Sequence, residues 1–169
     1  MFALDDNRQL PITNYQLPIT NYQMTKPTTQ LCTFFLDKLF FGIEVEKVQE
    51  VTRYREMTRV PLAPPVVGGL INLRGQIVTA IELRRRLDLS DRSPDTLPLN
   101  VIVRTGDETA SLLVDDIGDV LEVSEEDFET PPDTFTSQVR CLIRGAYKLK
   151  DRLLLFLDVD KVVDFTANG

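Results

Sequence analysis

From residue 31 onward, the chain is a succession of short apolar segments separated by turn-forming residues, and this pattern constrains the fold more than any other feature. The segments are rich in Val, Ile, Leu and Phe, and the residues between them are mostly Gly, Pro, Asp and Asn. Strands of about 4–8 residues bounded in this way are typical of an all-β barrel or sandwich, whereas amphipathic helices need longer stretches. The sequence therefore predicts a mainly β protein with little helix.

A polar linker divides the expected strands into two groups. It includes residues 91–95 and Pro98, and its prolines fix φ and lack the N–H that a strand ladder needs. Before the linker, the expected strands are residues 31–36, 40–45, 48–53, 69–73 and 76–83, with a short helical turn within residues 82–89. After it, they are residues 99–104, 109–114, 120–123, 139–148 and 152–159, with a capped helical turn at 124–127 and a brief helix within 160–165.

The N-terminal part of the chain has a different character. Residues 10–23 read LPITNYQ twice in succession, and the repeat neither continues nor provides the apolar seam of a coiled coil. Its prolines and Asn-Tyr steps disfavour a helix. We interpret residues 1–23 as a low-complexity, disordered extension, with Met24 as an alternative start, and expect residues 24–169 to contain the folded domain.

The charge balance and the absence of histidine exclude several functions. The chain has 19 Lys and Arg against 26 Asp and Glu, a net charge of −7, so phosphate backbones and anionic membranes should repel it. Because there is no histidine, Ser-His-Asp triads, Cys-His dyads and phosphoacceptor histidines are excluded. We expect no catalysis, no cofactor, no metal site and no nucleic-acid partner.

The cysteines and the hydropathy pattern bear on the compartment. Cys32 and Cys141 are far apart and have no CxxC spacing, so we expect two core thiols in a reducing cytosol. No apolar run approaches the ~20 residues of a membrane span, and the start lacks the features of a signal peptide. We therefore expect a cytoplasmic protein without membrane insertion.

Residues 68–75 form a glycine-punctuated segment, which lacks both the P-loop ending and the GxGxxG spacing of nucleotide-binding loops. If this segment is a strand, Asn72 and Arg74 point to one face because they are two residues apart. Glu50 lies on another apolar segment and is a possible partner for Arg74. Such a surface pair contributes little stability, so its value would lie in fixing a binding surface.

Two other groups of charged residues are candidate sites. The acidic residues within 115–122 and 151–164 lack the EF-hand spacing, and we interpret them as solvated surface. Residues 84–86 are three consecutive arginines, which fan out on a helical turn without interleaved aromatic residues. We expect them to contact carboxylates or other anions locally.

Taken in order, several short motifs resemble the CheW-like domain family. They are FGIEVEKVQEV at 41–51, VP at 60–61, GLINLRGQIV at 69–78, ELR at 82–84, LVDDIGDV at 113–120, IRG at 143–145 and LLLFLD at 153–158. Each motif alone is weak, but the ordered set is specific and covers about residues 31–165.

The resemblance implies two small five-stranded SH3-like β-barrels with short helices, over about residues 31–90 and 99–165, with strands that can cross between them. It also implies a non-catalytic, cytoplasmic adaptor that is recruited to membrane receptor arrays. Such adaptors bridge the cytoplasmic tip of a chemoreceptor and the regulatory domain of a CheA-type histidine kinase. The residues implied for the receptor-facing surface are Val48, Glu50, Asn72, Arg74 and Gly75. The kinase contact is assigned to the same N-terminal unit without residues.

Two alternatives remain open at this point. The first is a CheW-like adaptor of type IV pilus motility or of another kinase pathway. The second is a β-barrel that binds peptide or nucleic acid, although the acidic balance and the missing aromatic platform disfavour nucleic acid.

Overall fold

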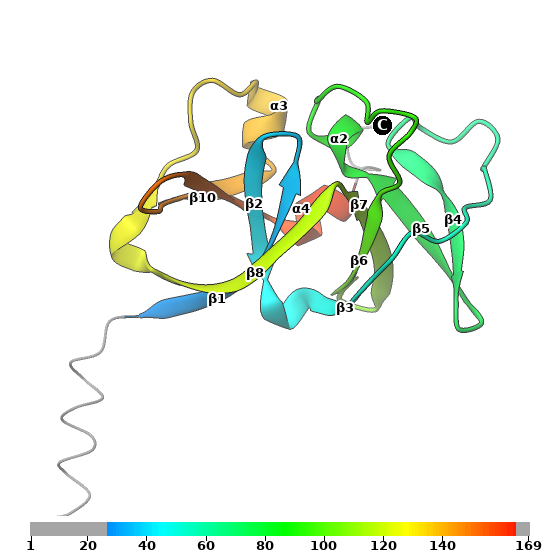
Figure 1. Cartoon of the computed structure of the whole chain (residues 1–169), viewed down its shortest axis with the longest axis horizontal. Helices are drawn as coiled ribbons and strands as arrows, with labels where there is room; N and C mark the ends of the chain where they lie inside the picture. The colour runs from blue at the N-terminus through cyan, green and yellow to red at the C-terminus, as the bar shows by residue number, and fades with distance from the viewer. Residues whose placement is uncertain (1–26, 165–169) are drawn as a thin grey trace, which may run out of the picture.

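A computed structural model describes residues 27–164, which form two β-sheets side by side (Figure 1). One sheet has six strands in the order β8-β1-β2-β11-β10-β9. Its strands are β1 (Thr28–Leu36), β2 (Leu39–Glu44), β8 (Asp116–Ser124), β9 (Phe128–Glu129), β10 (Ile143–Lys148) and β11 (Leu153–Leu157). The other has five strands in the order β3-β6-β7-β5-β4. They are β3 (Val48–Thr52), β4 (Val67–Leu73), β5 (Gln76–Glu82), β6 (Leu99–Thr105) and β7 (Glu108–Val114).

Short helices connect or follow these strands. They are η1 (Val45–Lys47), α2 (Leu83–Arg86), η2 (Glu125–Asp127), α3 (Ser137–Arg140) and α4 (Val159–Val163). The predicted β class is therefore confirmed, but the sheets are open and have six and five strands, rather than forming two closed five-stranded barrels. Both sheets nevertheless curl. In the six-stranded sheet only η2 separates the two edge strands β8 and β9, so the chain turns directly from one edge to the other.

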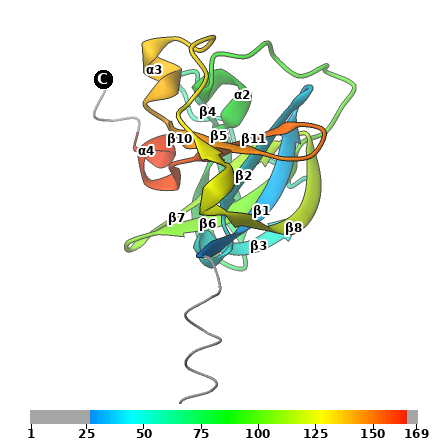
Figure 2. The same ribbon diagram turned by 90° about the vertical axis from the view of Figure 1, so that its left-hand side faces the viewer.

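Each sheet takes strands from both sides of the polar linker. Strands β1 and β2 join β8 to β11 in the six-stranded sheet, while β3 to β5 join β6 and β7 in the five-stranded sheet. Two parallel pairings, β2 with β11 and β5 with β7, connect the halves of the chain. Figures 1 and 2 show the interleaved colours that result. The linker thus divides the sequence without dividing the sheets.

Strand alternation places apolar residues on both faces of the central strands. A shared core lies between the two sheets and includes Phe34, Leu36, Phe41, Ile43, Val101, Val103, Leu112, Val114, Leu155 and Leu157. A second core lies within the six-stranded sheet and consists of Leu31, Phe40, Val123, Tyr147, Leu154 and Phe156. A third lies within the five-stranded sheet and consists of Ile71, Leu73, Val78, Ala80, Ile102 and Leu113. Because successive side chains point to opposite faces, strands with a core on each side have nearly continuous apolar runs.

Several local expectations need correction. The segment 139–148, expected to be one strand, begins instead with the last residues of α3, whose N-cap Thr136 accepts a hydrogen bond from the amide of Val139. Cys32 is buried as expected, but Cys141 is exposed just after this helix. The duplicated segment at 10–23 lies outside the described residues. Within residues 27–164, no helix has the length and apolar composition needed to cross a bilayer.

Candidate functional site

The tip of the β4–β5 hairpin is a two-residue turn formed by Arg74 and Gly75. Their φ angles are 53° and 89°, the left-handed values that such tight hairpin turns require. The side-chain carbonyl of Asn72 accepts a hydrogen bond from the Gly75 amide at 2.8 Å. Arg74 therefore belongs to the turn and is not on the strand face that it was expected to share with Asn72. A Cβ at residue 75 would meet no atom within 4 Å, so space does not require glycine there. The positive φ angle is what favours glycine.

Arg74 forms a two-pronged ion pair with Glu50 on β3, as the sequence had suggested. Its Nη1 lies 2.5 Å from Oε2 and its Nη2 lies 2.8 Å from Oε1. The Glu50 side chain is 20% exposed and that of Arg74 is 67% exposed. The hydrogen bond from Arg74 lowers the pKa of Glu50, and the same bond raises the pKa of Arg74. The pair is therefore charged, and most of the Arg74 side chain is exposed to solvent.

This ion pair joins the two edges of the five-stranded sheet. Strands β3 and β4 are at opposite ends of the strand order, yet Arg74 at the end of one hairpin reaches Glu50 on the other edge. Close by in sequence, Thr58 and Leu70 exchange two backbone hydrogen bonds of 2.8 Å across the same gap. A Cβ at Gly69 would lie 2.9 Å from the Thr58 carbonyl oxygen, so glycine permits this approach. The sheet thus curls so that the ion pair and the Thr58–Leu70 bridge link its two edges, although β3 and β4 do not pair directly.

The remaining residue of the predicted receptor-facing set, Val48, lies two residues before Glu50 on β3. It is half-buried on β3, packs against the shared core and pairs with Val103 of β6. A register shift lies between Val48 and Glu50. Sequence reasoning missed two apolar neighbours, namely Val51 on β3, which is 41% exposed, and Ile77, which is 63% exposed and pairs with Asn72. Their signal was an apolar side chain close in sequence to a predicted site residue, since Val51 follows Glu50 and Ile77 lies two residues after Gly75.

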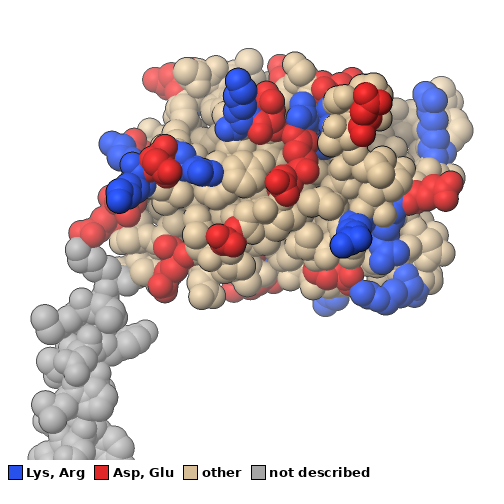
Figure 3. Space-filling view, viewed as in Figure 1, with Lys and Arg blue, Asp and Glu red and all other residues tan. Residues whose placement is uncertain are grey.

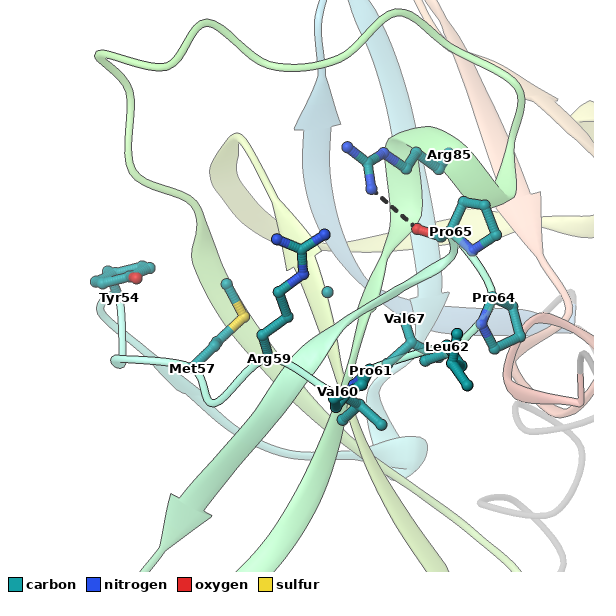
Figure 4. A pocket seen from close by; sticks show the side chains of 12 residues that line it. Tyr54, Met57, Arg59, Val60, Pro61, Leu62, Pro64, Pro65, Val67 and Arg85 are labelled. Atoms are coloured by element: carbon teal, nitrogen blue, oxygen red, sulfur yellow. Dashed lines mark hydrogen bonds between the residues drawn. The ribbon is translucent and has the colours of Figure 1, made fainter.

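A hollow of about 710 Å³ lies beside β4, under the loop that precedes it (Figure 4). Its lining includes Tyr54, Met57, Arg59 and Arg85, and Arg85 donates a hydrogen bond to the Pro65 carbonyl at 3.1 Å. Leu62 lies at its edge, fully exposed and with a φ of 64°. None of the described residues that line this hollow is a carboxylate. This hollow was not predicted from the sequence.

Several arginines in the described part of the chain bind carboxylates or backbone carbonyls. Arg84 binds Asp115 and Arg85 binds Asp91, as expected for contacts with carboxylates. Arg86 differs from the expectation, because it binds the neutral backbone carbonyls of Val162 and Lys161. Figure 3 shows acidic and basic groups interspersed on one face of the molecule. Among residues 27–164, no group of three or more acidic, cysteine or histidine residues is placed to hold a metal ion. The acidic residue Asp115 is an exception to the expected solvation and is described below.

Two curled sheets around a shared core, with an ion-paired hairpin tip and an open hollow, define a double-sheet β protein whose exposed features suit contact with other proteins. A family model described as the CheW-like domain matches residues 30–166. The chain therefore belongs to the CheW-like family of chemotaxis adaptors.

Individual relatives agree with this membership. The chemotaxis protein CheW of Treponema pallidum is 31% identical over 137 residues, which cover 79% of this chain and 81% of that protein. The chemotaxis protein CheW of Bacillus subtilis is 29% identical over 139 residues, which cover 82% and 89%. The crystal structure of the scaffolding protein TtCheW from Thermoanaerobacter tengcongensis matches with a TM-score of 0.71 at 26% identity, over 82% of this chain and 94% of that one.

Proposed function

We propose that this chain is a non-catalytic adaptor that couples the cytoplasmic tip of a chemoreceptor to the regulatory domain of a CheA-type histidine kinase. The observation that carries the proposal is the Glu50–Arg74 pair, which holds a charged hairpin tip at the surface of a CheW-like fold. On this proposal the protein acts in the cytoplasm and is recruited to membrane receptor arrays through its partners. Signal transfer then occurs by rigid contacts between proteins, without any chemical step on this chain.

We assign the receptor contact to the surface defined by Val48, Glu50, Asn72, Arg74 and Gly75. Both Glu50 oxygens are occupied by Arg74, so the guanidinium remains the group that can reach a partner. Exposed apolar side chains beside it, such as Ile77, suit the apolar stripe of a helix. The charge contributes specificity and orientation more than affinity. The kinase contact stays assigned to the N-terminal unit of the sequence, on a surface separate from this one.

The test is co-purification of the full chain with a receptor signalling-tip fragment and a kinase regulatory domain. We expect a complex that contains all three proteins. In Arg74→Glu, the new carboxylate repels Glu50 and reverses the charge that the hairpin tip presents to the receptor. The affinity for the receptor fragment should therefore fall by about tenfold. Kinase-domain binding and the thermal melt followed by circular dichroism should be retained.

Lys150→Glu provides the matched control, because it makes the same change of charge at an exposed position in the β10–β11 turn of the other sheet. It should bind the receptor fragment as the wild-type chain does. Normal receptor binding by a folded Arg74→Glu variant would contradict the assigned surface. Loss of the cooperative melt in that variant would instead make Arg74 a structural residue.

A further inference from the structure

A carboxylate at the crossing between the two sheets has an unusual set of partners. Asp115 lies between the end of β7 and the start of β8, and its side chain is 16% exposed. Its Oδ1 accepts hydrogen bonds from Arg84 Nε at 3.0 Å and from Arg92 Nε at 2.8 Å. Its Oδ2 accepts one from the backbone amide of Asp37 at 2.6 Å and a further bond from Arg84 Nη2. Four donors therefore converge on one carboxylate.

These donors come from separate parts of the fold. Asp37 is in the β1–β2 turn of the six-stranded sheet, and the Asp115 amide also donates to the Phe35 carbonyl on β1 at 3.0 Å. Arg84 is in α2, which follows β5 of the five-stranded sheet. Arg92 is in the linker, and its other nitrogens bind Glu82, the last residue of β5, at 3.0 and 3.3 Å. One carboxylate thus ties together both sheets and the linker.

The network is well enclosed and electrically balanced. Two guanidinium groups face two carboxylates, and the side chains of Arg84, Arg92 and Glu82 are 11%, 8% and 15% exposed. Salt screens such a partly buried cluster much less than an exposed pair. The shared core between the sheets buries apolar area, and the hydrophobic effect that stabilises it is non-directional. Charge-assisted hydrogen bonds from planar guanidinium groups are directional and add geometric specificity to that packing.

We propose that Asp115 is a positioning residue that sets the orientation of the two sheets relative to each other. Through Arg84, Arg92 and the Asp37 turn, it determines how the receptor-facing hairpin on one sheet is placed relative to surfaces on the other sheet. The consequence of this sheet orientation for signalling rests on the proposed adaptor function, because an adaptor that transmits through rigid contacts needs a fixed angle between its docking surfaces. The orientation itself can be measured without any partner.

The direct test is a distance between nitroxide labels on the two sheets, measured by double electron–electron resonance. The labels are placed at Asp107→Cys in the β6–β7 turn and at Lys150→Cys in the β10–β11 turn, two exposed positions. The background carries Cys141→Ser, because that thiol is exposed. Cys32 can remain, since burial raises the pKa of its thiol and disfavours the reactive thiolate.

We expect one narrow distance distribution in the labelled chain with Asp115 intact. Asp115→Asn should broaden it or add a second peak, while circular dichroism shows both sheets still folded. If Asp115→Asn does not fold, Arg92→Lys decides the question, because lysine keeps the charge but loses the planar fork that bridges Asp115 and Glu82. Asp91→Asn is the matched control, since that carboxylate is 65% exposed and pairs with Arg85, outside the Asp115 network. It should leave the distribution unchanged.

The inference is overturned if Asp115→Asn and Arg92→Lys, measured while folded, give the same distribution as Asp91→Asn. With partners present, we expect Asp115→Asn to bind the receptor fragment and the kinase domain separately with nearly wild-type affinity. Its receptor-dependent stimulation of the kinase should fall by about tenfold. Failure of the wild-type chain to bind either partner would contradict the proposed function, and the label distances would still decide the role of Asp115.

Discussion

At the scale of single residues, close approaches between backbone and side chains define where the chain can tolerate change. Thr33 on β1 is fully buried, and its hydroxyl donates to the Asp119 carbonyl of β8 at 2.5 Å. The register between β1 and β8 shifts at this point, between Cys32 and Phe34. Gly118 lies directly against Thr33, and a Cβ there would come within 2.4 Å of its hydroxyl oxygen. A buried polar contact therefore occupies the space that a side chain at residue 118 would need.

We expect Gly118→Ala to destabilise the protein by about 2 kcal/mol, the cost of forcing one extra methyl group into a well-packed site. Urea denaturation monitored by circular dichroism measures the change. In the background of Thr33→Ala, which removes the obstructing hydroxyl, the cost of Gly118→Ala should be smaller. If Gly118→Ala lowered the free energy of unfolding equally in both backgrounds, the clash with Thr33 would not be the cause of the destabilisation.

Residue-level reasoning anticipated one charged contact and missed another. Glu50 and Arg74 were identifiable because each is a charge within an apolar segment, where a partner is expected. Asp115 was grouped with Asp116 and Asp119, which are indeed exposed, and nothing local separates it from them. Its partners Arg84 and Arg92 come from an earlier part of the chain, and only the crossing of the strands brings them together.

At the scale of elements, strands with strong local signals were predictable and very short elements were not. The strands of the β1–β2 and β4–β5 hairpins were expected, because in each case two apolar runs flank a short polar or glycine-containing turn. The four-residue helix α3 and the two-residue strand β9 were missed, because neither is long enough to show a period. The order of strands in the sheets was also not predictable, since it depends on pairings between distant segments.

Strand β9 illustrates how little holds such a short element in place. It pairs with β10 through Phe128 and Glu129, and the rings of Phe128 and Tyr147 have centroids 5.0 Å apart. Gly145 lies beneath Phe128, and a Cβ there would come within 2.2 Å of that ring and within 2.7 Å of the Glu129 carbonyl oxygen. The absence of a side chain at residue 145 therefore permits β9 to lie against β10.

We expect Gly145→Ala to detach β9, with faster amide hydrogen exchange around residues 128–129 and 146–147. The global free energy of unfolding should fall by about 1–2 kcal/mol, because the added methyl group forces out only an edge strand. Hydrogen exchange measured by mass spectrometry reports the detachment of β9 segment by segment. Gly118→Ala serves as the comparison, since its effect should centre on β1 and β8. Unchanged exchange around β9 would contradict this account.

At the scale of the whole molecule, the Asp115 network should make stability depend on pH. Burial raises the pKa of Asp115, but hydrogen bonds from Arg84, the Asp37 amide and Arg92 outweigh it, so the pKa lies below its ordinary value of 3.8. A carboxyl whose pKa is lowered by folding stabilises the protein above its unfolded pKa. That contribution is lost as the pH falls through the lower, folded value.

We therefore expect Asp115→Asn to cost about 3 kcal/mol at neutral pH, because it leaves two enclosed guanidinium groups without their shared carboxylate. Below the unfolded pKa of 3.8 the difference from the wild-type chain should shrink as the wild-type carboxyl becomes protonated. Urea titrations at a series of pH values measure both effects. A difference that stays constant into the acid range would mean that the charge of Asp115 contributes nothing.

The interleaving of strands from both halves of the chain also sets the order in which strands can pair during synthesis. Strands β1 and β2 leave the ribosome early, yet their partners β8 and β11 are synthesised only after the whole five-stranded sheet. Pairings between such distant segments form late, because a long loop must close before they gain any contact. Leu31 and Phe40 of the first hairpin therefore stay uncovered until β10 and β11 have been translated, because their core neighbours Tyr147, Leu154 and Phe156 lie on those strands. That uncovered hairpin exposes apolar side chains of the kind that chaperones bind in incompletely folded chains.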